Sequence, residues 1–168
     1  MKKSIALAVF LSAALMLFGH GNEKRTAEVT VKGKKVSINY FSPHLNGRDM
    51  LSMVKEGMEW RMGADGPTAL TTDADLSFGS VVVPKGTYTL VAKNTGPDQW
   101  TLLFSSDSQI RGTKRDAQKD VASVPLTVAK IPQPEEHMNI ELKPAGDGAS
   151  FSLTWGSTSM AATFKVAG

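Results

Sequence analysis

The feature that most constrains the fold of this chain is a series of short segments in which apolar and polar side chains alternate, separated by turn residues. Residues 87–93 alternate between apolar and polar side chains, and residues 99–105 repeat the pattern. A period of two is typical of half-buried strands. Between the two segments, Asn94-Thr95-Gly96-Pro97-Asp98 supplies the residues of a tight reversal. We therefore predict a β-hairpin with one apolar face. That face comprises Tyr88, Leu90, Ala92, Trp100, Leu102 and Phe104, with Thr87, Thr89 and Lys93 on the opposite face.

Similar segments lie on both sides of this hairpin. Residues 27–40 predict two strands around a Lys-Gly turn, and residues 138–155 predict two more around Gly146-Asp147-Gly148. Pro125 interrupts another strand pattern, and because proline cannot donate to a ladder it indicates an edge position or a bulge. About nine short strands predict an all-β fold, an antiparallel β-sandwich or a jelly-roll-like barrel, rather than βαβ units.

Three connections are expected to lie outside this strand pattern. Asp49 can cap one short helix from Met50 to Glu56, and Gly57 can end it. Residues 110–119 are polar and lack an apolar period, so they predict an exposed connection. Ile131-Pro132-Gln133-Pro134 predicts a stiff linker.

The N-terminus has the layout of a secretory signal. Two lysines precede an uncharged, mostly apolar run from Ser4 to Phe18, which matches a basic n-region and a short h-region. A transmembrane helix needs about 20 apolar residues, so we expect no transmembrane span in the mature chain. We predict a helical signal peptide over residues 1–21, a leader over 22–26 and a single domain over 27–168. The protein would then be exported to the periplasm or beyond; an uncleaved anchor is the alternative.

Charge and cysteine content restrict the partners. The sequence has 19 basic and 16 acidic residues. Removal of residues 1–21 takes away two lysines and no acid, which leaves a formal net charge of +1. A nucleic-acid-binding surface usually needs clustered lysine and arginine, so no nucleic-acid partner is expected. The chain has no cysteine, so neither disulfides nor thiolate metal sites stabilise it.

Arg48, Trp60, Arg61 and Asp65 form the strongest candidate binding group. A guanidinium presents a planar fork of donors for a carboxylate or phosphate, and an indole offers a flat apolar face for a ring or a cation. Together they could hold a small polar ligand. The structural alternative is that Arg61 pairs with Asp65 or with backbone carbonyls while Trp60 closes one end of the sandwich. Trp100 is in register with core-facing residues and is expected inside, as is Trp155.

No catalytic motif is recognisable. The sequence contains no Gly-x-Ser-x-Gly elbow, no His-Glu-x-x-His helix and no Walker-type loop. We therefore expect no cofactor, no metal and no catalytic residue. One alternative is that His44 and His137 converge with Asp65 or Glu135 into a metal site; the other is that both imidazoles simply face water.

Several segments resemble, in order along the chain, the pattern of a known family. They are Tyr40-Phe41-Ser42-Pro43, Gly47-Arg48, Trp60-Arg61-Met62-Gly63-Ala64, residues 68–72, residues 83–88, Gln99-Trp100-Thr101 and Leu153-Thr154-Trp155-Gly156. As a set they are similar to domain-of-unknown-function family 2911, over roughly residues 27–166. The resemblance implies a bacterial exported β-sandwich domain and implies no reaction. Residues 50–59 depart from the family's pattern, which there commonly reads Phe-Gly-x-Leu-Val-Pro-Tyr-Gly.

Three classes of function remain open from the sequence. The first is a non-catalytic binding or interaction module of the bacterial cell envelope, with a small polar ligand or an envelope protein as its partner. The second is a structural envelope component that associates with itself. The third is a hydrolase or a metal-dependent enzyme.

Overall fold

The computed structural model describes residues 21–108 and 110–168, and strands account for most of them. The strands are β1 (Glu23–Val31), β2 (Lys34–Ser42), β3 (Glu59–Trp60), β4 (Ala69–Thr72), β5 (Leu76–Phe78), β6 (Val81–Val83), β7 (Gly86–Gly96), β8 (Gln99–Ser105), β9 (Asp120–Ala145) and β10 (Gly148–Val166). Two 3-10 turns, η1 (Gly112–Lys114) and η2 (Ala117–Lys119), lie between β8 and β9. No α-helix occurs in these described ranges.

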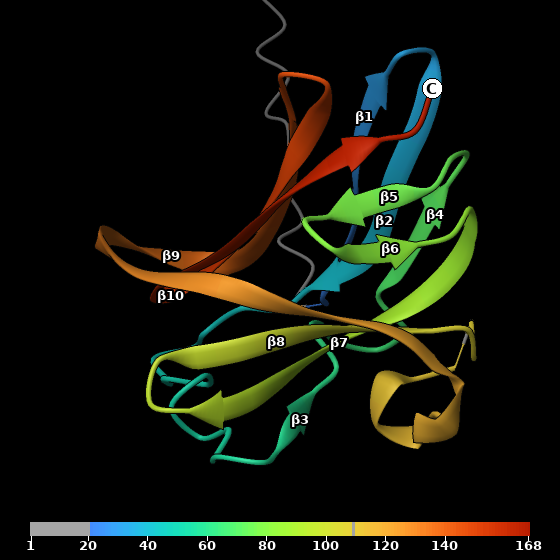
Figure 1. The fold of residues 1–168 in the computed structure, drawn as a ribbon. Helices are drawn as coiled ribbons and strands as arrows, with labels where there is room; N and C mark the ends of the chain where they lie inside the picture. Colours follow the sequence, from blue (N-terminus) through green and yellow to red (C-terminus); the bar gives the residue numbers. More distant parts are fainter. Residues whose placement is uncertain (1–20, 109) are drawn as a thin grey trace, which may run out of the picture.

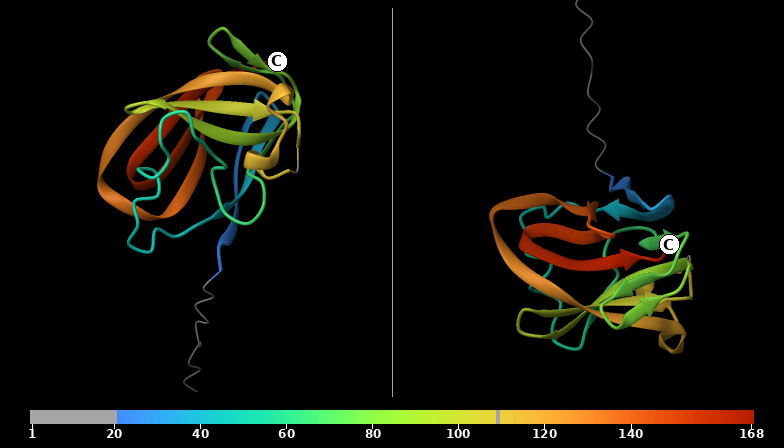
Figure 2. Two further views of the ribbon diagram at one scale, coloured as in Figure 1. Left: turned by 90° about the horizontal axis from the view of Figure 1, so that it is seen from below. Right: turned by 45° about the horizontal axis from the view of Figure 1, so that its top comes forward.

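The strands pair antiparallel in the order β1-β2-β4-β7-β8-β9-β10-β5-β6, with β3 added beside β7. The predicted all-β, antiparallel fold is thereby confirmed. The long strand β9 pairs with β8 over its first residues and with β10 from Thr127 onward. Figure 1 shows the β9–β10 ribbon bending back, so that its hairpin end lies beside β1. In Figure 2 the same ribbon curves around one side of the molecule.

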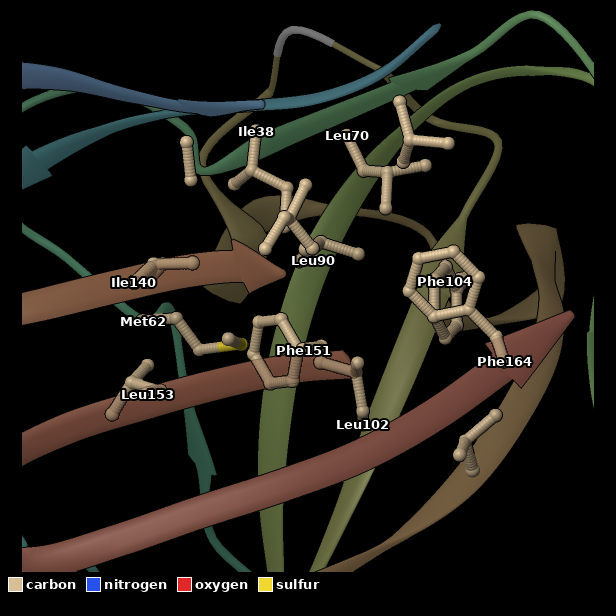
Figure 3. Close-up of a cluster of buried hydrophobic side chains, with 14 of the residues drawn as sticks. Ile38, Met62, Leu70, Leu90, Leu102, Phe104, Ile140, Phe151, Leu153 and Phe164 are labelled. Carbon is tan, nitrogen blue, oxygen red and sulfur yellow. The ribbon is translucent and has the colours of Figure 1, made fainter. Parts of the chain in front are cut away.

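The core lies between the two parts of this folded sheet. Figure 3 shows side chains from β2, β4, β7 and β8 converging on side chains from β9 and β10. The predicted apolar face of the β7–β8 hairpin is buried along its whole length. Ile38, Leu90 and Phe104 are completely buried, and each such side chain contributes about 1.5–3 kcal/mol on transfer from water.

Strand β7 differs from the prediction because it is covered on both faces. Thr89, expected on a solvated face, is completely buried, as is Val91. The Thr89 hydroxyl donates to the carbonyl of Asp107 at 3.0 Å, so the segment after β8 lies over this face. The approach is close: a Cβ at Gly112 would come within 2.5 Å of Val91 Cγ2. The first part of the predicted connection, as far as η1, therefore covers β7 as well as linking β8 to β9.

Most of the predicted leader belongs to the first strand. Residues 23–26 form the first part of β1 instead of a loose leader, and Glu23 is paired with Ser42 of β2. Glu23, Lys24 and Thr26 are solvent-exposed and Arg25 is partly exposed, so these four residues lack the apolar alternation that indicates a strand. Arg25 also donates twice to the Glu23 carboxylate, at 2.9 and 2.7 Å.

The helix predicted for residues 50–56 is absent. The segment forms successive turns, with Met53 N donating to Met50 O and Val54 N to Leu51 O. Asp49 does accept from the backbone at the start, from Ser52 N at 3.2 Å. A two-turn helix is marginal by itself, and here β7 competes for the later backbone groups: Gly57 N donates to the carbonyl of Asn94 at 2.8 Å.

The predicted linker at residues 131–134 is part of β9. Its two prolines are tolerated because the β9–β10 register runs from Lys130 directly to Glu135, with a bulge between them. Pro125 lies where β9 pairs only with β8, which agrees with the predicted edge position.

The predicted signal peptide lies outside the described residues, apart from Gly21. Among the residues that are described, no helix has the length and apolar character needed to cross a membrane.

Candidate functional site

The three tryptophans of the chain form one group, which we call the tryptophan cluster. Trp60 stacks on Trp155 with ring centroids 5.6 Å apart and planes 14° apart. Trp60 also contacts Trp100 edge-on, with ring centroids 6.4 Å apart. Trp100 and Trp155 are buried, as predicted, and Trp60 is partly exposed. Aromatic pairs of this kind contribute about 0.5–1.5 kcal/mol beyond their buried area.

A tightly held loop after β3 fixes the position of Trp60. Met62 is fully buried and has a φ of 55°, a left-handed conformation that costs a residue with a side chain about 1–2 kcal/mol. The Thr68 hydroxyl stabilises it by donating to the Met62 carbonyl at 2.7 Å. Ala64 N donates to Phe41 O at 3.1 Å. Hydrogen bonds thus hold the loop on either side of Gly63, at Met62 and at Ala64, and the loop gives Trp60 a rigid support.

A pocket of about 360 Å³ lies beside Trp100, and we call it the Trp100 pocket. Residues 49–56, the β7–β8 turn and neighbouring parts of β9 and β10 form its walls. Leu51, Val54 and Val128 add apolar surface to that of Trp100. Charges of both signs surround it, from Asp49, Lys55, Glu56, Asp98 and Lys130.

Asn94 ties two walls of the pocket together. Its Nδ2 donates to the carbonyl of Val54 at 2.7 Å, and its Oδ1 accepts from Gly96 N at 3.0 Å. The first bond holds the loop of residues 49–57 against β7, and the second shapes the β7–β8 turn. On the opposite wall, Lys130 Nζ donates to the Thr158 hydroxyl at 3.2 Å. These bonds leave the pocket largely pre-formed, which is typical of small-molecule sites.

The four residues predicted as a binding group have different surroundings in the structure. Trp60 joins the tryptophan cluster. Arg48 is exposed, and its Nε donates only weakly to Leu45 O, at 3.4 Å. Asp65 is exposed and accepts from Asn22 Nδ2 at 3.1 Å. Arg61 is partly buried and packs close to Gly112: a Cβ added to that glycine would lie 3.5 Å from the Arg61 Cα.

No hydrogen bond or ion pair among the described residues joins any two of these four, so the pairing of Arg61 with Asp65 is not found. The buried arginine of this region is Arg115 instead, with a side chain only 2% exposed. It donates to Glu59 at 2.6 Å and to Asp120 at 2.7 Å. These two carboxylates raise the pKa of the Arg115 guanidinium above its usual range. Since Glu59 precedes Trp60, the ion pairs also anchor β3.

Sequence reasoning missed Arg115 because it stands in a charged stretch without periodicity. Its partners come from β3 and from the start of β9, and no local spacing relates these positions. The only available signal was compositional: residues 110–119 contain several basic residues, and nothing distinguishes the one that is buried.

The structure brings together part of the hypothetical metal set. His44 and His137 form an isolated antiparallel bridge, and their ring centroids are 4.0 Å apart. Asp65 and Glu135 do not complete a site with them, because no group of three or more His, Cys, Asp or Glu residues in the described ranges has the geometry to hold a metal.

These observations define a small antiparallel all-β domain with a pre-formed pocket beside a tryptophan cluster. Residues 22–164 match the family described as "Protein of unknown function (DUF2911)". The chain therefore belongs to this family. No curated protein and no solved structure matches it.

Proposed function

We propose that this chain is an exported, non-catalytic binding module of the bacterial cell envelope that takes a small polar ligand in the Trp100 pocket. The observation that carries the proposal is the pocket itself, with a volume of about 360 Å³ next to the tryptophan cluster. That volume lies at the lower end of the range of about 300–1,000 Å³ typical of ligand sites. Export is supported by the basic and then apolar N-terminal sequence.

The composition of the walls favours a saccharide that also carries charged groups. Trp100 offers an aromatic surface to a sugar ring, and Ser52, Asn94 and Thr158 offer hydroxyl and amide groups to its oxygens. Lys55 and Lys130 suit a carboxylate of the ligand, while the acidic residues of the rim suit an amine. Amino sugars and acidic sugars of cell-wall glycans have this combination.

Of the predicted binding group, Trp60 supports the pocket through its contact with Trp100, and Arg48 adjoins Asp49 at the rim. Arg61 and Asp65 do not line it. The proposed ligand site is therefore shifted from the predicted group toward β8 and the end of β9.

Intrinsic fluorescence tests the proposal, because every tryptophan of the chain belongs to the cluster. We would titrate the protein with neutral sugars, amino sugars, peptidoglycan fragments and organic anions while recording the tryptophan emission. A charged saccharide is expected to change the emission saturably. Lys130→Ala should weaken the affinity of the protein for this saccharide by about tenfold to a hundredfold, since a hydrogen bond to a charged group contributes about 1.5–3 kcal/mol.

The matched control is Lys165→Ala, which removes a lysine that is 72% exposed and pairs with Asp147. Lys165 does not line the Trp100 pocket. The Lys165→Ala protein should therefore bind the saccharide with the same affinity as the unaltered protein. A flat response to the whole panel, or equal losses in the two lysine variants, would contradict the proposal.

A further inference from the structure

The seam between the end of β2 and the middle of β9 holds two histidines directly opposite each other. His44 and His137 are partners in an antiparallel bridge. Two backbone hydrogen bonds flank the pair: Leu45 N donates to Glu136 O at 2.9 Å, and Met138 N donates to Pro43 O at 3.0 Å. The two Cα atoms are thus held in register by the fold, independently of any contact between the rings.

The rings lie on the same side of this seam. Their centroids are 4.0 Å apart and their planes are inclined by 55°. Directly opposite residues of an antiparallel pair have Cβ atoms about 4.5–5.5 Å apart. At that separation two imidazoles can direct one nitrogen each at a common ion, after rotation about χ2, a torsion with broad minima. The backbone pairing thus places the two imidazoles where both could bind the same ion.

One of the four ring nitrogens is buried without a partner. His137 Nδ1 has no hydrogen bond to any described residue. Buried polar atoms are normally satisfied, and an exception calls for a group that completes it, such as a water or an ion. A metal ion would use this lone pair directly, since neutral imidazole nitrogen is a common metal ligand.

Two carboxylates lie in the surroundings of the pair. Glu23 belongs to the strand beside β2, where it is paired with Ser42. Ser42 in turn donates to the carbonyl of Met138, next to His137, at 2.6 Å, so Glu23 lies close to the pair; its carboxylate is itself paired with Arg25. On β9, the carboxylate of Glu136 lies next in sequence to His137 and accepts from Asn46 N at 3.0 Å.

We propose that His44 and His137 together bind one divalent first-row transition-metal ion, with water completing its coordination. Imidazole pairs suit Cu²⁺, Ni²⁺ and Zn²⁺, whereas Mg²⁺ and Ca²⁺ prefer oxygen ligands. Because the described residues supply only two such ligands, affinity should follow the general order in which Cu²⁺ exceeds Ni²⁺ and Zn²⁺. The site is separate from the Trp100 pocket, whose lining includes neither histidine.

Calorimetric titration of the untagged full-length chain with CuCl₂, ZnCl₂ and MgCl₂ tests this site. We expect about one Cu²⁺ per chain, weaker binding of Zn²⁺ and no binding of Mg²⁺. His44→Ala and His137→Ala should each weaken Cu²⁺ binding at least tenfold. The chain has three histidines, and His20→Ala is the matched control, which should bind as the unaltered protein does. Undiminished Cu²⁺ binding in the His137→Ala protein, or its loss in the His20→Ala protein, would overturn the assignment.

A second measurement avoids variants altogether. Substoichiometric Cu²⁺ broadens the NMR signals of nuclei close to it, so the imidazole signals of His44 and His137 should disappear first and together. Broadening that begins elsewhere, at His20 or at exposed carboxylates, would show adventitious ions only and would overturn the proposal.

Discussion

Trp60 stacks on Trp155, with ring centroids 5.6 Å apart and planes inclined by only 14°. The contact joins the two-residue strand β3 to the longer strand β10, which have no ladder between them. It therefore fixes the loop after β3 against the far side of the folded sheet. Trp100 packs edge-on against Trp60 and lines the adjoining pocket, so the stack also holds one wall of that pocket in place.

Replacement of Trp60 by alanine should destabilise the domain by about 2–4 kcal/mol. Loss of a buried aromatic side chain costs about 3–5 kcal/mol, and the partial exposure of Trp60 lowers that figure. Trp60→Phe retains a ring on Trp155 and should cost about 1 kcal/mol. Urea unfolding followed by circular dichroism measures both; equal losses would mean that the stack contributes little.

Asn94→Ala should loosen the Trp100 pocket. It removes the bond to the Val54 carbonyl and the bond from Gly96 N, at a cost of about 1–2 kcal/mol. Because the first bond holds residues 49–57 in place, ligand affinity should also fall. Asn39→Ala is the control, since the Asn39 side chain accepts an exposed hydrogen bond from Thr26 and does not line the Trp100 pocket. Hydrogen exchange of residues 49–57 should accelerate in the Asn94 variant alone.

Arg115→Met should cost about 3–5 kcal/mol, because it leaves two carboxylates without their cation in a largely buried setting. Arg25→Met, which removes an exposed ion pair with Glu23, should cost less than about 1 kcal/mol. Chemical denaturation of the two proteins gives the comparison. A loss below about 1 kcal/mol for Arg115→Met as well would contradict a buried ion-pair network around Arg115.

Tyr88 makes stability fall at high pH. Burial raises the pKa of its phenol, and the Asp75 carboxylate acts in the same direction. The unfolded chain therefore ionises first above about pH 10, so the contribution is complete below that pH and is lost as pH rises toward the higher folded-state pKa.

Tyr88→Phe removes this contribution, and the free energy of unfolding should decline less between pH 8 and pH 11 than in the unaltered protein. At pH 8 the variant should be about 1 kcal/mol less stable, because the Pro84 carbonyl loses its donor. A decline identical to that of the unaltered protein would assign the alkaline loss to other groups.

Local patterns predicted the strands because alternation records which side chains face the core. The hairpin from Tyr88 to Phe104 is the clearest case. The pattern also misled where tertiary contacts decide: Thr89 looks solvent-facing by period, but it is buried and its hydroxyl is bonded to the carbonyls of Asp107 and Ile110. The helix expected at residues 50–56 has a suitable cap, but bonds to Asn94 take its place.

The sites depended on relationships that no local period reports. Trp60 is distinctive in the sequence, yet its neighbours Trp100 and Trp155 come from distant strands. Arg115 gave no signal in its charged stretch. The sequence allows His44 and His137 to converge, and only the seam between β2 and β9 shows that they meet each other.

The three indole N–H signals in an NMR spectrum of the nitrogen-labelled protein test the ligand site most directly. Titration with a charged saccharide should shift the Trp100 signal saturably, with smaller shifts for Trp60 and Trp155 and little change at the Lys165 amide. Binding that leaves all three indole signals in place while amides elsewhere respond would contradict a ligand site beside the tryptophan cluster.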